Sequence, residues 1–441
     1  MGKILLLTIL ASVGGAALFR PWIGIVTYYL LALLGPQYIW WWVFDGQRVS
    51  LVVAIASIVG VLMKFLNKRY DTSFLFNKQN GWLVFLWLCI VCSFFWGPYV
   101  SAFSFSGLGP KQIFSLYNTI FIFYFISVLE IDELYKLRYL FGILVVSTLF
   151  LTYWANIQYF SQNWAQFNHG RLMGPTSVFG QGIYRDENTF AMFFVSGLPF
   201  VYYLGWQIKK KWLKLLLWSF IPLGWHAIFL TGSRGGLLGS IVIMMTILIL
   251  SNRKILAFPL VLVFMLFYQL QAGDVMHNRS EYIVNIEGEN SAGDRITAWK
   301  GGLRIIMSHP ITGVGLSSFI TALPDYIESR HMVAHNTLVQ FAAESGVGAG
   351  LAYLVIVGFF FNNALKIRRW TSAQPIDEEI QFIGLCNNAS ISSFSGLIVC
   401  SLFLSLNTYE VFFVLLLFNN ALYQIYLRKF NPTFRSSFSR Q

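Results

Sequence analysis

Charged residues are scarce in this chain of 441 residues, in which Asp, Glu, Lys and Arg together make up 11%. A typical soluble domain has roughly 25% of these residues, because it must cover its surface with polar groups. The chain is instead 56% hydrophobic, and apolar runs of about 20 residues recur along nearly its whole length. This composition excludes a cytosolic enzyme and a disordered chain, and it predicts a polytopic membrane protein.

Cysteine is also rare, and each of the four cysteines lies inside an apolar run. This number excludes a secreted disulfide scaffold. Cys89 and Cys92 form a CxxC pair, but no second Cys or His pair completes a zinc site, so we interpret all four as small packing residues. The chain also lacks the HExxH, DxD, GxSxG and P-loop patterns of metal hydrolases, metal-dependent glycosyltransferases, serine hydrolases and nucleoside triphosphatases.

The hydrophobic pattern predicts an all-α polytopic membrane protein that forms a single integral membrane domain over residues 1–441, without a linker or an internal repeat. The first apolar run is interpreted as a retained segment, because no small-residue cleavage site follows it and Arg20-Pro21-Trp22 leads into another apolar run. The predicted spans are 4–19, 23–44, 49–66, 81–97, 112–129, 138–160, 188–206, 212–230, 235–250, 255–270, 335–363, 383–404 and 410–427.

Lys and Arg gather in the loops at 64–80 and 207–214, in 366–369 and in the tail 428–441. If the spans alternate, these segments lie on one side of the membrane, which the positive-inside rule makes cytoplasmic. The same rule accounts for the net charge of +12 without a nucleic-acid partner. Thirteen spans with a cytoplasmic C-terminus would place the N-terminus outside, so the number of spans stays at 12 or 13.

The longest predicted outer loop covers residues 271–334. Within it, Ile296, Trp299, Leu303 and Ile306 recur at helical spacing, which favours an amphipathic helix on the membrane surface. His309-Pro310 is expected to end this helix.

Positive charge on the predicted outer side comes mainly from arginine. This choice points to phosphate, because a planar guanidinium can contact two phosphate oxygens at once. Salt bridges with the acidic residues of the long loop are the alternative explanation. The outer basic residues are Arg48, Arg171, Arg185, Arg234, Arg279, Arg295, Arg304 and Arg330, with Lys111 and Lys300.

Thr231-Gly232-Ser233-Arg234-Gly235-Gly236 stands where one predicted span ends outside and the next begins. Arg234 would therefore lie at a helix N-terminus, where backbone N–H groups and the helix dipole favour an anion. Ser233 precedes it as a possible contact to the same anion. The alternative is a tight turn with an arginine that extends to the membrane surface.

His335-Asn336 opens a later span at the same predicted boundary. A neutral imidazole there could accept a proton from a hydroxyl group, with Asn336 and the deeper Glu344 as further polar groups. A hydrogen-bonded structural histidine is the alternative. Further candidates for substrate contacts lie elsewhere in the predicted outer loops. In the long loop they are Arg295 and Arg304. Before the span at 188–206 they are Arg171 and, in the polar cluster at 185–188, Arg185 and Asn188.

Several of these patterns resemble the O-antigen ligase and polymerase family of bacterial envelope glycan transferases. They are the Ser-Arg-Gly-Gly turn at 233–236, Arg295-x3-Trp299 with His309-Pro310 and Gly313-Val314-Gly315, and His335-Asn336 with Gly346 after nine intervening residues. The family often has Gly, Thr or Tyr three residues after that Gly, where this chain has Ala349. The likeness covers roughly residues 185–405. Arg20-Pro21-Trp22-Ile23-Gly24 and the aromatic run at 38–42 resemble the exosortase-associated O-glycosylation ligase branch.

The resemblance implies a donor glycan on undecaprenyl diphosphate at the outer face of the bacterial inner membrane, and an acceptor hydroxyl on a lipid-linked sugar, a growing glycan or a protein. It implies that Arg234 and Arg295 bind the diphosphate and that His335 is the general base. No cofactor and no metal is expected, because fixed guanidinium groups can stabilise the charge on the leaving diphosphate.

Other functions use the same residue types. A repeat-unit polymerase or a protein O-glycosyltransferase would differ from a ligase only in the acceptor, and the N-terminal resemblance favours the ligase. A flippase or secondary transporter for lipid-linked glycans would also bind diphosphate. Transporters, however, tend to place polar residues near the bilayer midplane and to contain repeats. A structural membrane scaffold is the remaining alternative.

Overall fold

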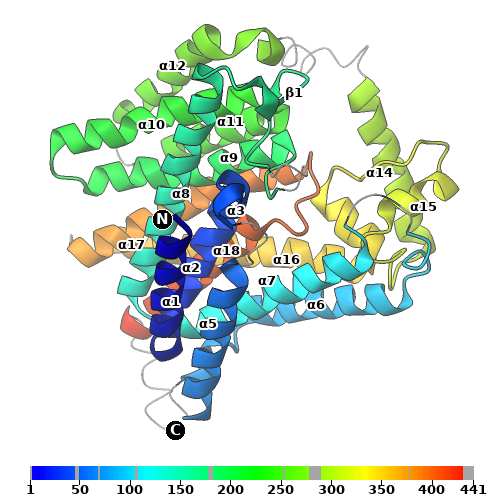
Figure 1. Cartoon of the computed structure of the whole chain (residues 1–441), viewed down its shortest axis with the longest axis horizontal. Helices are drawn as coiled ribbons and strands as arrows, with labels where there is room; N and C mark the ends of the chain where they lie inside the picture. The colour runs from blue at the N-terminus through cyan, green and yellow to red at the C-terminus, as the bar shows by residue number, and fades with distance from the viewer. Residues whose placement is uncertain are drawn as a thin grey trace.

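The computed structural model describes residues 2–44, 49–67, 70–103, 105, 108–176, 182–251, 254–277, 290–375 and 377–430. Over these residues the protein is a bundle of α-helices with one two-stranded hairpin (Figure 1). Parts of the predicted outer loop (278–289) and of the predicted tail (431–441) lie outside the described residues, as do Arg48 and Arg279.

The helices follow the hydrophobic runs of the sequence. In the first half of the chain they are α1 (Gly2–Phe19), α2 (Pro21–Leu34), α3 (Pro36–Ile39), α4 (Trp41–Phe44), α5 (Val49–Leu66), α6 (Lys78–Trp96), α7 (Pro110–Glu130), α8 (Leu134–Phe160) and α9 (Glu187–Gln207). In the second half they are α10 (Lys211–Leu230), α11 (Arg234–Leu250), α12 (Lys254–Gln271), α14 (Asn290–Ser308), α15 (Phe319–Tyr326), α16 (Thr337–Ala373), α17 (Glu378–Ser401) and α18 (Glu410–Phe430).

Ten of the described helices are long and apolar enough to cross a membrane, and three shorter apolar helices accompany them. In chain order these helices fall on the predicted spans, which confirms the all-α polytopic fold. One boundary differs clearly from the prediction. Helix α16 continues to Ala373, so the basic segment 366–369 lies on a helix and not in a loop.

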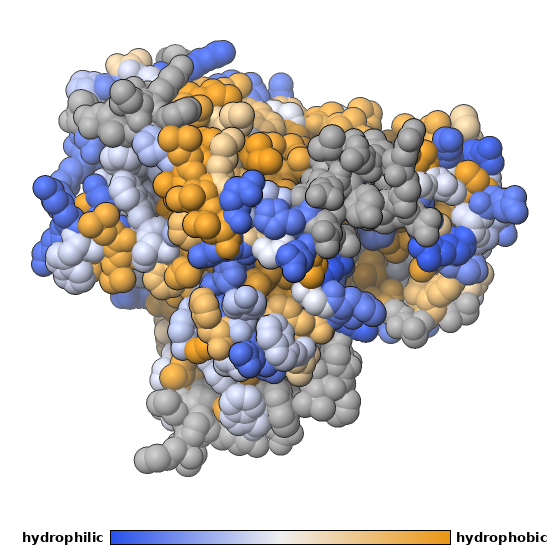
Figure 2. Space-filling model, turned by 90° about the horizontal axis from the view of Figure 1, so that it is seen from above, coloured by the Kyte–Doolittle hydropathy of each residue, from blue (hydrophilic) through white to orange (hydrophobic). Residues whose placement is uncertain are grey.

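The outer surface of the bundle is rich in apolar side chains. Figure 2 shows hydrophobic side chains exposed over much of one face, with hydrophilic side chains between them and along its margins. Exposed leucine, isoleucine and phenylalanine side chains recur along α5, α6 and α12, including Leu62, Phe95 and Leu266. Apolar surface of this extent is suited to contact with lipid chains.

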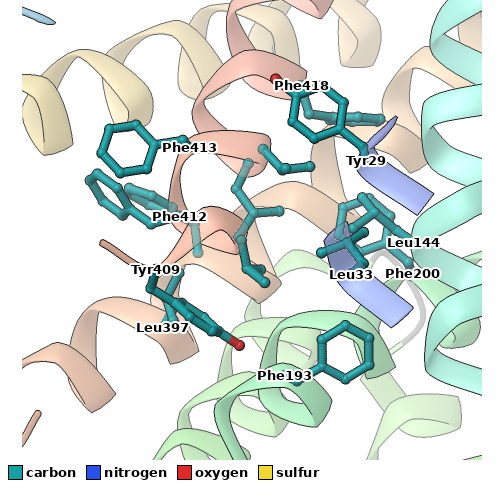
Figure 3. Packing of buried hydrophobic residues seen from close by; sticks show 14 of the residues in the cluster. Tyr29, Leu33, Leu144, Phe193, Phe200, Leu397, Tyr409, Phe412, Phe413 and Phe418 are labelled. Carbon is teal, nitrogen blue, oxygen red and sulfur yellow. The ribbon is translucent and has the colours of Figure 1, made fainter. Parts of the chain in front are cut away.

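Helices α9, α17 and α18 form the centre of the bundle and are the most deeply buried of the candidate spans. Aromatic side chains of α18 fill this centre: Phe412 packs against α17, and Phe418 lies edge-on to Phe200 of α9 with ring centroids 5.5 Å apart (Figure 3). Leu144 of α8 and Leu33 of α2 close the same cluster. This core holds α9, α11 and α16 in place, and these three helices begin at the same end of the bundle, which we call the site end.

The short helices α14 and α15 lie together beside the bundle, at the right of Figure 1. Helix α14 covers the predicted amphipathic segment and ends at Ser308, directly before His309-Pro310, as the sequence predicts. Its apolar face joins a separate small cluster, in which Ala298 and Ile305 pack against Phe319 and Leu323 of α15. The cluster docks α14 against the start of α16.

A break inside α16 receives the loop that follows α14. Ser345 and Gly346 leave the helical conformation, and Gly346 has φ 84°. The loop supplies replacement partners: Val347 N–H donates to the Pro310 carbonyl at 2.8 Å, and Val314 N–H donates to the Ala343 carbonyl at 2.9 Å. A Cβ atom at Gly346 would lie 2.0 Å from the Ile311 carbonyl oxygen. Only glycine permits both this backbone conformation and this close approach.

Candidate active site

The turn before α11 places Arg234 at the first position of that helix, as the sequence predicts. Ser233 is the N-cap, and its Oγ accepts a hydrogen bond from the Gly236 N–H at 3.2 Å. Ser233 is fully buried and the Arg234 side chain is largely buried. A guanidinium at the positive end of a helix dipole is electrostatically unfavourable when no anion is present. Together, the guanidinium and the helix N-terminus create a strong positive potential that favours an anion.

A hairpin that the sequence analysis did not predict supports this turn. Strands β1 (Phe167–Asn168) and β2 (Arg171–Leu172) are joined by His169 and Gly170, whose φ angles are 48° and 74°. Positive φ at both central residues is the hairpin geometry that Gly-containing dipeptides favour, so His-Gly between Asn168 and Arg171 was the available signal.

The hairpin directs Arg171 toward the turn and toward the start of α9. Its Nε donates to the Thr231 carbonyl at 2.9 Å, and its Nη2 donates to Asn188 Oδ1 at 3.2 Å. Its Nη1 lies 3.6 Å from Glu187 Oε2. Two of the predicted site residues, Arg171 and Asn188, therefore contact each other, and they fix the backbone three residues before Arg234.

His335 is held in a constrained backbone conformation with φ 48°, a region that costs a non-glycine residue on the order of 1–3 kcal/mol. Both neighbours are anchored. The Ala334 carbonyl accepts a hydrogen bond from Trp299 Nε1 at 2.9 Å. Asn336 is the N-cap of α16, where its Oδ1 accepts from the Val339 N–H at 3.0 Å and its Nδ2 donates to the Leu402 carbonyl at 3.2 Å.

Trp299 also links the helix that carries Arg295 to the backbone next to His335. The two α14 residues are one helical turn apart and share a face, and Trp299 is tied to the residue before His335. Burial lowers the pKa of His335 below its usual 6.5, the positive charge of Arg295 lowers it further, and the Asp186 carboxylate opposes them. The imidazole is therefore neutral near pH 7 and able to accept a proton.

The sequence analysis included Asp186 only as a member of the polar cluster at 185–188. In the structure its negative charge acts to raise the pKa of His335. Asp186 is the N-cap of α9, and its Oδ1 accepts from the Thr189 N–H at 2.8 Å. An acidic N-cap directly before an apolar run is a helix-start signal that the sequence carried. Its electrostatic effect on His335 joins residues far apart in the chain, which the sequence alone could not show.

A segment between α17 and α18 joins the parts of the site, and sequence reasoning missed it. Cys400 Sγ contacts the Gly235 carbonyl at 3.2 Å, which ties the end of α17 to the arginine turn. Thr337 Oγ1 donates to the Leu404 carbonyl at 2.7 Å. Through this segment the Arg234 turn and the start of α16, which carries His335, are held at the same end of the bundle.

Arg304 and Arg185 stand apart from these contacts. Arg304 follows Arg295 by nine residues, a spacing that turns it to the opposite face of α14, and its Nη1 donates to the Tyr326 carbonyl at 2.8 Å. Arg185 is exposed and lines a cavity of about 650 Å³ beside Asp186 and Glu187.

Glu344 is buried and points toward the start of α15. Its Oε1 accepts from Gln340 Nε2 at 2.6 Å and from the Phe319 N–H at 3.3 Å. Its carbonyl accepts from Gly315 N–H and Ser93 Oγ at the break in α16. These contacts position the loop between α14 and α16.

Among the residues that the structure describes, no group of three or more His, Cys, Asp or Glu side chains is placed to hold a metal ion. The metal-independent mechanism stays a prediction.

Comparison with known proteins finds one family that part of the chain resembles. Residues 219–354 match the family model described as O-antigen ligase. This segment of the chain is therefore similar to the O-antigen ligases. The matched segment runs from within α10 into α16 and contains Arg234, Arg295 and His335, while Arg171, Arg185 and Asn188 precede it. A search of curated proteins finds no significant match. The family supports a membrane glycan ligase or polymerase, and so a glycosyltransferase-like enzyme in a multi-pass membrane protein.

Proposed function

We propose that this protein is a glycan ligase of the bacterial inner membrane. It transfers a preassembled glycan from undecaprenyl diphosphate to an acceptor hydroxyl on a lipid-linked sugar or a protein, at the periplasmic face. The observation that carries the proposal is the hydrogen bond from Trp299 to the Ala334 carbonyl, which links the helix that carries Arg295 to the residue before His335. The family match over 219–354 supports the same chemistry.

The donor diphosphate binds Arg234 and Arg295 in this mechanism. One guanidinium lies at the start of α11 and the other on α14, so the phosphate oxygens receive hydrogen bonds from two separate elements. Negative charge builds on the diphosphate as its bond to the sugar breaks. Fixed guanidinium groups stabilise that charge more in the transition state than in the ground state, which is the requirement for catalysis.

His335 serves as the general base. The acceptor oxygen attacks the anomeric carbon, the bond from that carbon to the phosphate oxygen breaks, and undecaprenyl diphosphate leaves with the electron pair. The acceptor proton passes to the imidazole. The neutral form required for this step is favoured by burial and by the charge of Arg295,.

The other predicted residues hold the site in shape. Arg171 and Asn188 fix the turn before Arg234, and Ser233 caps α11. Asn336 caps α16, while Glu344 positions the loop between α14 and α16. Arg185, on the exposed cavity beside Asp186, is placed to contact the glycan or the acceptor.

A repeat-unit polymerase would use the same donor chemistry, and only the acceptor distinguishes the two. The test is the size distribution of lipid-diphosphate-linked glycan in the native host, compared between wild type and His335→Ala at equal membrane protein levels. Accumulation of long, unattached glycan supports the ligase. Accumulation of single repeat units identifies a polymerase instead, and an unchanged profile removes His335 as an essential base.

A further inference from the structure

A second cavity, of about 530 Å³, lies at the end of the bundle opposite the candidate active site. It is bounded by the last turn of α9, the end of α11, the last turns of α16 and the first turns of α17. At their other ends α9, α11 and α16 begin beside the candidate active site, and α17 ends there. The cavity therefore lies at the far junction of the helices that build the candidate site.

Arg368 of α16 contributes a fixed positive charge to this cavity. Its Nη1 donates to Asn388 Oδ1 at 3.0 Å, and its Nη2 donates to the Leu250 carbonyl at 3.1 Å. Both partners are uncharged, so the cation is oriented without being neutralised. None of the described residues that line the cavity is Asp or Glu. The nearby Glu378 is paired with Lys209, 3.5 Å away.

The opposite wall is aromatic, and Lys214, which does not itself line the cavity, packs near it. Trp218 Nε1 donates to the Tyr202 carbonyl at 3.1 Å, which fixes the Trp206 and Tyr202 side of the cavity. Lys214 Nζ lies 5.2 Å from the Trp206 ring and 5.5 Å from the Trp218 ring. Aromatic and basic side chains at the ends of spans are typical of the headgroup level of a membrane.

We propose that this cavity binds the headgroup of an anionic glycerophospholipid. Arg368 contacts its phosphate, the amide and hydroxyl side chains of the cavity contact the glycerol, and Leu250 and Leu385 accept the start of an acyl chain. Basic pockets between membrane helices on the cytoplasmic side bind anionic headgroups in this way. The basic segments at 207–214 and 366–369 make this the predicted cytoplasmic end.

The position of the cavity and the residues that line it favour a lipid over a soluble anion. The cavity opens at the ends of spans, Trp206 is 40% exposed beside it, and apolar side chains share the wall with the cation. A bound lipid would bridge four helices, of which only α16 and α17 are joined by the chain at this end. Ligand binding to the folded state alone stabilises it by mass action, so the lipid is expected to raise the unfolding temperature.

The test is native mass spectrometry of the purified full chain in micelles with equal amounts of phosphatidylglycerol and phosphatidylcholine of the same chain length. Wild type is expected to retain one phosphatidylglycerol preferentially, and Arg368→Gln to lose this preference by about tenfold, the value of a charge-assisted contact. Arg369→Gln is the matched control, because Arg369 is the next residue in the chain, is exposed and lies outside the cavity lining.

A second variant separates lipid loss from misfolding, because Arg368 also bonds to α11 and α17. At Gly384, which lines the cavity, an added Cβ meets only Thr371, at 3.8 Å, so Gly384→Leu adds an apolar side chain at the cavity wall and suits the helix better than glycine. This variant is expected to keep its fold, to lose the retained phosphatidylglycerol and to lose the rise in unfolding temperature on adding it. Equal retention of both lipids by wild type, or undiminished retention by Gly384→Leu, overturns the proposal.

Discussion

At the scale of single residues, the account depends on guanidinium geometry at Arg234. This side chain stands at the first position of α11 and is largely buried, so it reaches an anion from a fixed place. A lysine there would keep the positive charge, but it offers a single rotatable ammonium group instead of a planar fork.

We therefore predict that Arg234→Lys lowers kcat/KM for glycan transfer by roughly 100-fold, the usual cost of losing a preorganised donor at developing charge. The measurement is transfer from lipid-linked donor by purified, reconstituted protein. Unfolding temperature is the control for folding. Turnover near the wild-type level would contradict a two-oxygen contact.

The pH dependence of the reaction tests the electrostatic environment of His335. The base must be neutral, so activity falls as pH drops through its pKa, which lies below 6.5. Asp186 raises that pKa. Removing its charge in Asp186→Asn is expected to shift the acidic limb of the kcat/KM profile to lower pH.

Glu328→Gln serves as the matched control for that shift, because Glu328 is exposed on the segment that carries His335 and its loss changes the net charge equally. The limb should stay in place in this variant. A limb that moves to higher pH in Asp186→Asn, or that moves equally in both variants, would show that another group titrates.

At the scale of elements, the site depends on how α14 and α16 are joined. Trp299 of α14 holds the Ala334 carbonyl. In Trp299→Phe the ring packing is largely kept, but the hydrogen bond is lost, at a cost of about 1 kcal/mol in stability. Because a small misplacement of a catalytic group has large kinetic effects, kcat is expected to fall by about tenfold or more.

Trp164→Phe is the control for a general effect of removing an indole, since Trp164 is 56% exposed in the segment between α8 and β1. Steady-state kinetics of both variants would decide the matter. If the two lose equal activity, Trp299 has no special part in holding His335.

The break in α16 gives a stability prediction. Gly346→Ala meets a carbonyl oxygen at 2.0 Å and requires φ 84°, so unfolding free energy should fall by about 2–5 kcal/mol. Gly358 lies on the same helix with open space around it, and Gly358→Ala should be neutral or slightly stabilising. Thermal unfolding in detergent compares the two, and equal unfolding temperatures would contradict the role given to Gly346.

The sequence predicted the helices and their ends better than the contacts between distant residues. The apolar runs predicted the spans because burial in lipid requires about 20 apolar residues, and helix-end signals located Arg234 and α14. The half-turn offset between Arg295 and Arg304 follows from the helical period and was readable in advance. The sequence could not predict the buried hydrogen-bond partners of Glu344 or the effect of Asp186 on the pKa of His335. Both interactions join residues far apart in the chain.

At the scale of the whole molecule, the account describes a bundle whose site end carries a phosphate-binding and proton-accepting site. The reaction needs no metal in this mechanism, since two guanidinium groups stabilise the leaving diphosphate. Transfer by the reconstituted protein is therefore expected to persist, within about twofold, in excess chelator. Strict dependence on a divalent ion would overturn the metal-independent mechanism.

The most direct measurement of the central claim is transfer of glycan from undecaprenyl diphosphate to an acceptor hydroxyl by purified protein in vesicles, comparing wild type with His335→Ala. His331→Ala is the control, because His331 is an exposed histidine four residues earlier in the same segment. The account predicts product and released undecaprenyl diphosphate with wild type and His331→Ala, and at least about 100-fold less with His335→Ala. Equal rates for all three proteins would contradict it.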